Sequence, residues 1–190
     1  AGFDFVIVES VGLGQSEIDI DNAVDMLLML VPPGGGDGLQ ATKKGIMEAA
    51  DLVIINKADG TLLTQAKHTC SDYKGAMHFI KQKNIHWQPS VELISAREQT
   101  GLNSVESRIA EFHDVMSSSG SLSNKRIEQA MHWMWAQYRR QIVIENEKRE
   151  DVKMTASKLK ADLALQRISS RLAAQRLVEG LRIDIGLPAH

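Results

Sequence analysis

The chain has 190 residues, 43% of them hydrophobic and 24% charged, with 22 lysines and arginines against 24 aspartates and glutamates. This composition excludes a disordered chain, and the length predicts one domain with an appendage. The near-neutral charge argues against nucleic acid as a partner, no apolar run is long enough to cross a membrane, and the single cysteine, Cys70, excludes an intrachain disulfide and fits a reducing compartment.

The first half of the chain alternates short apolar runs with amphipathic stretches. The runs are residues 3–8, 26–31, 52–55 and 91–94. Their Val, Ile and Leu content predicts strands that are buried on both faces of a mostly parallel sheet. The stretches with helical spacing are residues 39–50, 62–83 and 102–116. This alternation predicts a doubly wound α/β domain.

After this half the strand pattern ends. Residues 117–124 read SSSGSLSN, which predicts a linker. Residues 126–150 have apolar positions at steps of three and four, which predicts a long helix. Residues 151–183 predict two further helices, with Ser169 as the N-cap of the second. We therefore divide the chain into an α/β part, residues 1–118, and a helical arm, residues 119–190.

The strongest functional motif is Asn56-Lys57-Ala58-Asp59, directly after the apolar run LVII. Loops at the carboxyl ends of parallel strands are where such sheets bind ligands. The Asp59 carboxylate can accept hydrogen bonds from N1–H and the exocyclic amine of guanine, and adenine offers neither donor at that edge. Asn56 can bond the N7 edge, and the aliphatic stem of Lys57 can cover the ring. A solvated turn after a strand is the alternative.

A second polar loop, Ser95-Ala96-Arg97, follows the run at 91–94. In guanine-nucleotide proteins a Ser-Ala loop after the next strand presents a backbone amide to the guanine oxygen. The pair of residues is common by itself, and its value comes from its position after the first motif.

The segment FDFVIVESVG, residues 3–12, ends an apolar run in Glu9 and places Gly12 three residues later. Phosphate-binding sheets often carry an acid at this position, which holds the magnesium shell or orients water. The Gly12 amide could approach a terminal phosphate closely because glycine has no side chain. The polar residues that follow suit a switch loop, and a strand that ends in a glycine turn is the alternative.

A glycine-rich stretch, PPGGGDG at residues 32–38, precedes LQATKKG. It predicts either a conformational switch or an ordinary flexible loop. It is no phosphate loop, because the pattern GxxxxGK[ST] appears nowhere in the chain.

Together these segments resemble the methylmalonyl-CoA mutase-associated GTPases, the bacterial MeaB/ArgK group and its mitochondrial relative, the methylmalonic aciduria type A protein. The matching segments are VIVESVGLGQSE (6–17), VPPGGGDGLQATKKGI (31–46), ADLVIINKADG (50–60), SAREQTGL (95–102) and MHWMW (131–135). The glycine-rich loop followed by LQxxKKGI is peculiar to this family, and the resemblance covers essentially the whole chain.

The resemblance implies a P-loop GTPase fold with a helical C-terminal arm that forms a homodimer. It implies GTP or GDP with Mg2+ as ligands. It also implies a chaperone that protects methylmalonyl-CoA mutase and gates the loading of adenosylcobalamin, with no nucleic acid or membrane as a partner. The location would be the mitochondrial matrix in a eukaryote and the cytoplasm in a bacterium. A related client, such as isobutyryl-CoA mutase, stays open.

The resemblance also assigns roles to single residues. Glu9 would be the catalytic switch acid near the attacking water and Mg2+, bound to the metal through water, and Gly12 would contact the terminal phosphate. The residues that would bind guanine are Asn56, Lys57, Asp59, Ser95, Ala96 and Arg97. The residues that would respond to nucleotide or to the mutase are Gln15, Asp37, Gln40 and Lys43. The family usually has Thr at Ser10 and often an acid at Gly38, so the glycine-rich switch would be looser here.

The chain begins at Ala1 and enters an apolar run at once. Because the resembling proteins carry the phosphate loop and a central first strand upstream, we expect a preceding segment. Without it, the runs at 3–8 and 26–31 would lose the strand between them and expose pairing edges. We therefore expect this chain alone to fold poorly and not to hydrolyse GTP, and the intact parent to be active.

Two other functions stay open. One is a nickel-insertion GTPase, although such proteins usually carry Cys/His metal sites and this chain shows none in its sequence. The other is a nucleotide-dead helical interaction module, in which residues 125–183 bind a partner.

Overall fold

The computed structural model describes residues 2–10, 20–34 and 44–184, with side chains up to residue 179. The chain divides into two compact units, Ala1–Met131 and His132–His190. The expected boundary between residues 118 and 119 coincides with a break between two helices, whereas the units divide inside the second of these helices. Each unit is described by itself.

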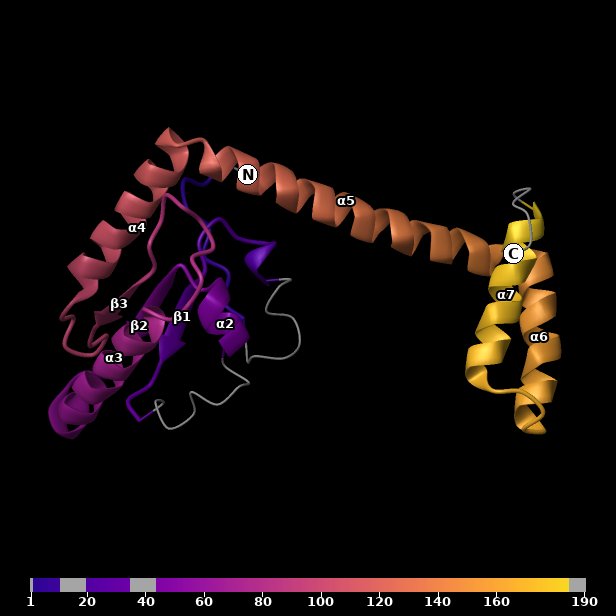
Figure 1. The fold of residues 1–190 in the computed structure, drawn as a ribbon, viewed down its shortest axis with the longest axis horizontal. Coiled ribbons are helices and arrows are strands. Elements are labelled where there is room, and N and C mark those ends of the chain that lie inside the picture. Colours follow the sequence, from indigo (N-terminus) through magenta and orange to yellow (C-terminus); the bar gives the residue numbers. More distant parts are fainter. Residues whose placement is uncertain (1, 11–19, 35–43, 185–190) are drawn as a thin grey trace. The chain divides into compact units, whose positions relative to one another are not determined.

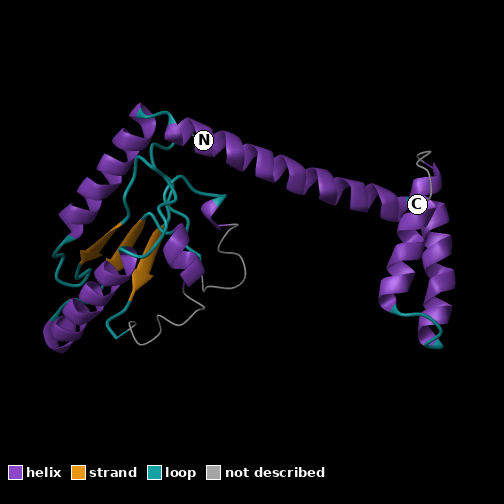
Figure 2. Cartoon of the chain, viewed as in Figure 1, coloured by secondary structure: helices purple, strands orange, loops and turns teal. Residues whose placement is uncertain are grey.

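The first unit contains a parallel sheet and the helices that cover it (Figures 1 and 2). Its elements are β1 (Leu28–Val31), α2 (Lys44–Ala49), β2 (Leu52–Ile55), the short 3-10 helix η3 (Gly60–Leu62), α3 (Leu63–Met77), β3 (Ser90–Leu93), α4 (Leu102–Ser118) and the first part of α5 (Ser121–Lys148). The strands pair in the order β1-β2-β3, and all pairs are parallel. The predicted α/β class and three of the four predicted strands are confirmed.

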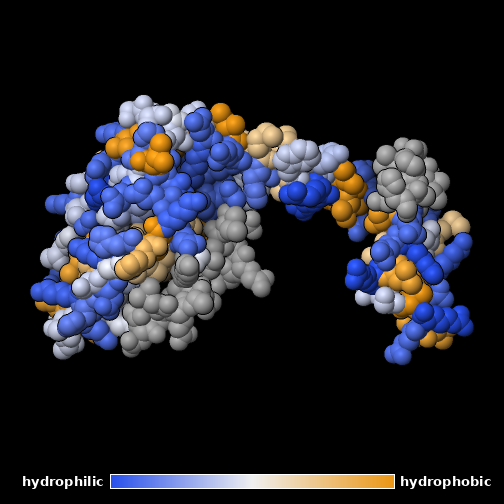
Figure 3. All heavy atoms as spheres, viewed as in Figure 1, coloured by the Kyte–Doolittle hydropathy of each residue, from blue (hydrophilic) through white to orange (hydrophobic). Residues whose placement is uncertain are grey.

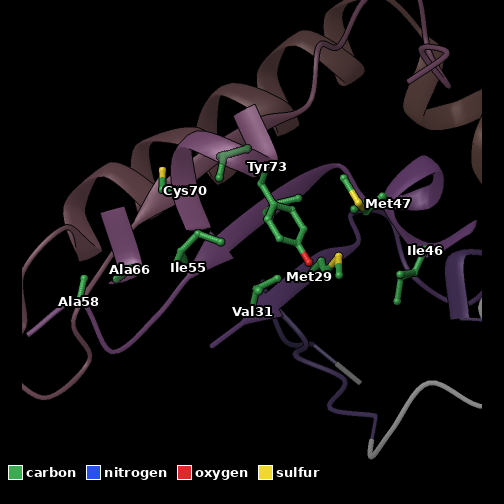
Figure 4. Close-up of a cluster of buried hydrophobic side chains, with 12 residues drawn as sticks. Met29, Val31, Ile46, Met47, Ile55, Ala58, Ala66, Cys70 and Tyr73 are labelled. Carbon is green, nitrogen blue, oxygen red and sulfur yellow. The ribbon is translucent and has the colours of Figure 1, made fainter. Parts of the chain in front are cut away.

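The two faces of the sheet bury different helices. On one face, the strands pack against α2 and α3 in a cluster that includes Met29, Val53, Val91 and Tyr73 (Figure 4). On the other face, Leu52, Ile54 and Ile94 pack with Val105 of α4. β2 is central, and all four of its residues are buried, as its continuous apolar sequence requires. Helices on both faces make the domain doubly wound.

The predicted strand at residues 3–8 is wrong. This segment forms no strand, and the side chains of Phe3, Phe5 and Ile7 are 76%, 75% and 93% exposed. A strand requires a hydrogen-bonding neighbour, and within the described residues no strand lies beside this segment. β1 is an edge strand of the described sheet, and Leu30 on it is 65% exposed.

Two predicted helix boundaries also need correction. The predicted linker at 117–124 is wrong, because α4 continues to Ser118 and α5 begins at Ser121. The serines cap helices here, since the Ser121 amide and hydroxyl contact the Ser119 hydroxyl and Gly120 takes a left-handed φ of 73°. α3 ends at Met77, short of the predicted residue 83.

A cluster of ion pairs joins the beginning of α5 to the sheet. Lys83 Nζ lies 2.8 Å from Asp21 Oδ1 and 3.1 Å from Asp51 Oδ1, and Lys125 Nζ lies 3.0 Å from Asp21 Oδ1. Asp51 is 3% exposed and also accepts a hydrogen bond from the Leu27 amide. The segment before β1, the start of β2 and the first turns of α5 therefore share one charge network.

The second unit is helical, as predicted. It contains the end of α5, then α6 (Glu150–Ala164) and α7 (Ser170–Asp184), which pack as a hairpin that buries Leu159 and Ala173. The predicted N-cap is confirmed, because the Ser169 hydroxyl accepts a hydrogen bond of 3.2 Å from the Leu172 amide. Apolar surface is visible along α5 and over the hairpin (Figure 3). None of the helices that the structure describes combines the length and apolar character needed to span a bilayer.

The charge cluster predicts a pH dependence of stability. Burial raises the pKa of Asp21, but hydrogen bonding and attraction to Lys83 and Lys125 outweigh burial and leave its pKa lowered. The group therefore stabilises the fold above the unfolded pKa of 3.8, and this stabilisation is lost as pH falls through the lowered value. Asp21→Asn should cost about 1–2 kcal/mol at pH 7 in urea unfolding and much less near pH 3. Asp72→Asn, on an exposed position of α3, is the control, and equal losses at both pH values would contradict the assignment.

The core contains a buried hydroxyl whose removal should help. Tyr73 is fully buried, and its Oη has no hydrogen-bond partner in the described structure. A buried polar group without a partner costs about 1–3 kcal/mol, so Tyr73→Phe should raise the free energy of unfolding by about 1 kcal/mol. A loss of stability on this substitution would contradict the prediction, because it would show that the Tyr73 hydroxyl makes a stabilising hydrogen bond.

Candidate functional site

The candidate site is formed by the two loops that follow β2 and β3. These strands pair in parallel, so their carboxyl ends meet at one edge of the sheet. The pairing continues past the strands, because the Ile94 amide donates to the Ile55 carbonyl at 2.8 Å and the Ala58 amide donates to the Ile94 carbonyl at 3.0 Å. The structure thus brings Asn56–Asp59 beside Ser95–Arg97, which lie about 40 residues apart in sequence.

Asn56 connects the two loops. Its Oδ1 accepts hydrogen bonds from the Lys57 amide at 2.7 Å and from the Ala96 amide at 3.1 Å. Its own amide donates to the Val31 carbonyl at the end of β1, at 3.1 Å. Lys57 has a left-handed φ of 61° and an exposed side chain. Asn56 is therefore a brace for the loop pair, and the residue after it is held in a strained turn.

Asp59 is held by Ser95 through a side-chain hydrogen bond between the loops. The Ser95 hydroxyl donates to Asp59 Oδ2 and accepts from the Glu98 amide at 3.0 Å. Ser95 is fully buried, whereas Asp59 is only half-buried. Asp59 Oδ1 has no hydrogen-bond partner among the described residues. A carboxylate fixed on one oxygen and open on the other can accept two neighbouring donors from a ligand.

The other residues of the second loop are placed differently. The Ala96 amide, expected as a donor to a ligand, already donates to Asn56 in this structure, so a ligand would have to share or displace that bond. Arg97 is exposed and forms no hydrogen bond or ion pair with a described residue.

The structure does not bring the predicted catalytic acid into this loop pair. Glu9 is exposed and forms no hydrogen bond or ion pair with a described residue. Gly12, Gln15, Asp37, Gln40 and Lys43 lie outside the described residues. No group of three or more His, Cys, Asp or Glu side chains within the described ranges could hold a metal ion.

α3 links the first loop to the start of the glycine-rich stretch. The Gly34 amide donates to Thr69 Oγ1 at 3.0 Å, and this hydroxyl donates to the Gln65 carbonyl. A Cβ at Gly34, where φ is 79°, would lie 2.6 Å from Gln65 Nε2. The sequence analysis did not identify this anchor, because no motif relates Thr69 to a residue 35 positions away.

The closure of the second loop was also not predicted. Ser95 and Thr100 exchange two backbone hydrogen bonds, of 3.0 and 3.1 Å, and Gly101 follows with a φ of 76°. A glycine directly before the expected helix at 102 was the only available signal.

Comparison with known proteins bears on the class and the family of the chain. Residues 1–151 match the family model described as methylmalonyl-CoA mutase-associated GTPase MeaB. The chain is 35% identical over 178 residues to a Caenorhabditis elegans protein named methylmalonic aciduria type A homolog, mitochondrial. This alignment covers 94% of the chain and 45% of that protein. It is 40% identical over 143 residues to GTPase ArgK of Escherichia coli, in an alignment that covers 75% of the chain and 43% of that protein.

A solved structure supports the fold. The crystal structure of an LAO/AO transport system kinase superimposes with a TM-score of 0.72 at 31% identity, over 95% of the chain and 58% of that structure. The fold and the sequence matches place the chain in the GTPase class of α/β proteins. More narrowly, it belongs to the methylmalonyl-CoA mutase-associated GTPase family, MeaB. The chain spans less than half the length of the two curated relatives named above.

Proposed function

We propose that the whole protein binds guanine nucleotides and hydrolyses GTP, and that Asn56–Asp59 and Ser95–Arg97 recognise the guanine base. The observation that carries this proposal is the Asp59 carboxylate, which is held on one oxygen by the buried Ser95 hydroxyl and has no hydrogen-bond partner among the described residues on the other. Membership of a family described as GTPases supports the same function.

The chemistry of the base explains the proposed selectivity. Guanine presents N1–H and an exocyclic amine side by side, which matches a carboxylate with an open oxygen. Adenine presents an acceptor at N1, so the Asp59 carboxylate would face a lone pair and lose both hydrogen bonds. A site that is built to bond a group rejects analogues without it by large factors. The exposed Lys57 stem would cover one face of the base, and the side-chain NH2 of Asn56 would donate to its N7 edge.

We assign phosphate chemistry to the segments around Glu9 and Gly12. In this proposal Glu9 orients the attacking water and Gly12 contacts the terminal phosphate. Mg2+ would supply charge neutralisation at the phosphates when bound, and Glu9 would contribute one carboxylate to its outer shell. Gln15, Asp37, Gln40 and Lys43 are proposed as the residues that respond to nucleotide or partner. The sequence match to the family in these segments supports the assignment.

The proposed partner is methylmalonyl-CoA mutase, with adenosylcobalamin loading and protection as the process served. The family description names association with that mutase, and this supports the proposal. A homodimer through the arm is supported by the exposed apolar side chains of α5, which include Trp135 (46%), Tyr138 (55%) and Ile142 (45%). The mitochondrial matrix is the proposed location in a eukaryote, in line with relatives named mitochondrial, and the cytoplasm in a bacterium.

The base assignment makes a direct prediction. Asp59→Asn turns one acceptor oxygen into a donor, so it should weaken GDP binding about 10- to 100-fold relative to ADP, in the chain or in any longer product of its gene. Competition for a fluorescent guanine nucleotide measures this ratio, and Asp72→Asn, an exposed carboxylate on α3, is the matched control. An unchanged GDP-to-ADP ratio in folded Asp59→Asn would show that this loop does not read the base.

A further inference from the structure

The loop that holds Asp59 is closed at a position where a side chain cannot fit. Gly101 follows the paired residues Ser95 and Thr100 and is the N-cap residue before α4, with a left-handed φ of 76°. A Cβ at this position would lie 2.5 Å from the Leu93 carbonyl oxygen and 3.1 Å from Ile94 Cγ2. Contacts under 3.0 Å with backbone require a shift, so any other residue at 101 would push the end of β3.

Two contact routes connect this position to Asp59. In the first, the Ile94 carbonyl accepts from the Ala58 amide, so displacement of Ile94 moves the residue before Asp59. In the second, the Ser95–Thr100 closure fixes the Ser95 hydroxyl, which donates to the carboxylate. Both routes end at the Asp59 side chain. Neither includes a group that is expected to touch the ribose or the phosphates of the nucleotide.

We propose that Gly101 is a positioning residue for base recognition, because the close approach of its backbone to Leu93 and Ile94 sets the carboxylate of Asp59. This inference rests on the proposed guanine function. Gly101 itself does not touch the base. Its substitution should therefore change discrimination between bases that differ at the edge Asp59 reads, and leave phosphate-dependent binding much less affected.

Inosine diphosphate is the suitable probe, because hypoxanthine lacks the exocyclic amine of guanine and is otherwise the same ring. We expect the wild-type protein to prefer GDP over IDP about tenfold, the value of one lost hydrogen bond to a charged group. Gly101→Ala should reduce this preference to about twofold or less. Gly75→Ala is the matched control, since a Cβ at Gly75 in α3 meets no atom within 4 Å, and it should keep the wild-type ratio.

Amide hydrogen exchange gives a second readout that needs no nucleotide. In Gly101→Ala the amides of Ala58 and Ser95 should exchange at least tenfold faster than in the wild type, and in Gly75→Ala they should not. If the wild type shows no preference for GDP over ADP, the proposed function fails, and the exchange rates still decide the positioning role. Wild-type exchange at both amides in a folded Gly101→Ala would overturn the inference.

A second variant separates the Cβ contact from the backbone conformation. Asparagine tolerates a left-handed φ better than alanine, so Gly101→Asn should fold even if Gly101→Ala fails to fold. It carries the same Cβ. It should show the same loss of GDP preference and the same faster exchange. Wild-type behaviour of Gly101→Asn in both measurements would also overturn the inference.

Discussion

The parallel pairing of β2 with β3 is the constraint on which the candidate site depends. Four aligned residue pairs, from Leu52–Ser90 to Ile55–Leu93, bring the ends of the two strands to the same edge of the sheet. Backbone hydrogen bonds then continue the pairing into the loops, and Ser95 reaches Asp59 across the gap. The strands are held by burial, because the side chains of β2 are almost completely removed from water on both faces. The polar site is thus built on an apolar element that has no exposed face.

α3 has a second part in this arrangement. It begins soon after Asp59, buries Tyr73 against β1 and α2, and anchors Gly34 through Thr69. The start of α3 therefore follows the Asn56–Asp59 loop, and its middle packs in the core. Between these two points, Thr69 binds Gly34 at the start of the glycine-rich stretch. One hydrogen bond joins Gly34 to this helix, and the Thr69 hydroxyl that accepts it donates in turn to the Gln65 carbonyl within α3.

The sequence predicted the parts of the fold that depend on local pattern. The strands around Leu30, Ile54 and Val91 and the loops after two of them follow from apolar runs with polar ends. The run at Phe3 and Ile7 has the same composition but forms no strand, because strand formation requires a neighbour and composition cannot supply one. The serine-rich residues 117–124 predict a linker, although serine hydroxyls can cap helices as readily as they suit a loop.

The site shows the same division between pattern and geometry. Asn56, Asp59 and Ser95 stand out in the sequence because their residue types and their spacing match a known chemistry. The contact of Gly101 with Leu93 was not, because a positive φ and a close backbone approach leave no mark in sequence beyond a glycine. Residue types with a recognisable chemistry are therefore easier to predict from sequence here than a glycine whose role is a close backbone approach.

The central claim is that the Asp59 carboxylate binds the guanine base. The NMR signal of its carboxyl carbon tests this claim most directly. NMR of the protein with 13C-labelled aspartate carboxyl groups, with the Asp59 signal assigned by substitution, would follow this group during titration with GDP and with ADP. The account predicts that the Asp59 signal shifts with GDP and stays in place with ADP at the same concentration. An Asp59 chemical shift that does not change with GDP, or that changes equally with both nucleotides, would contradict it.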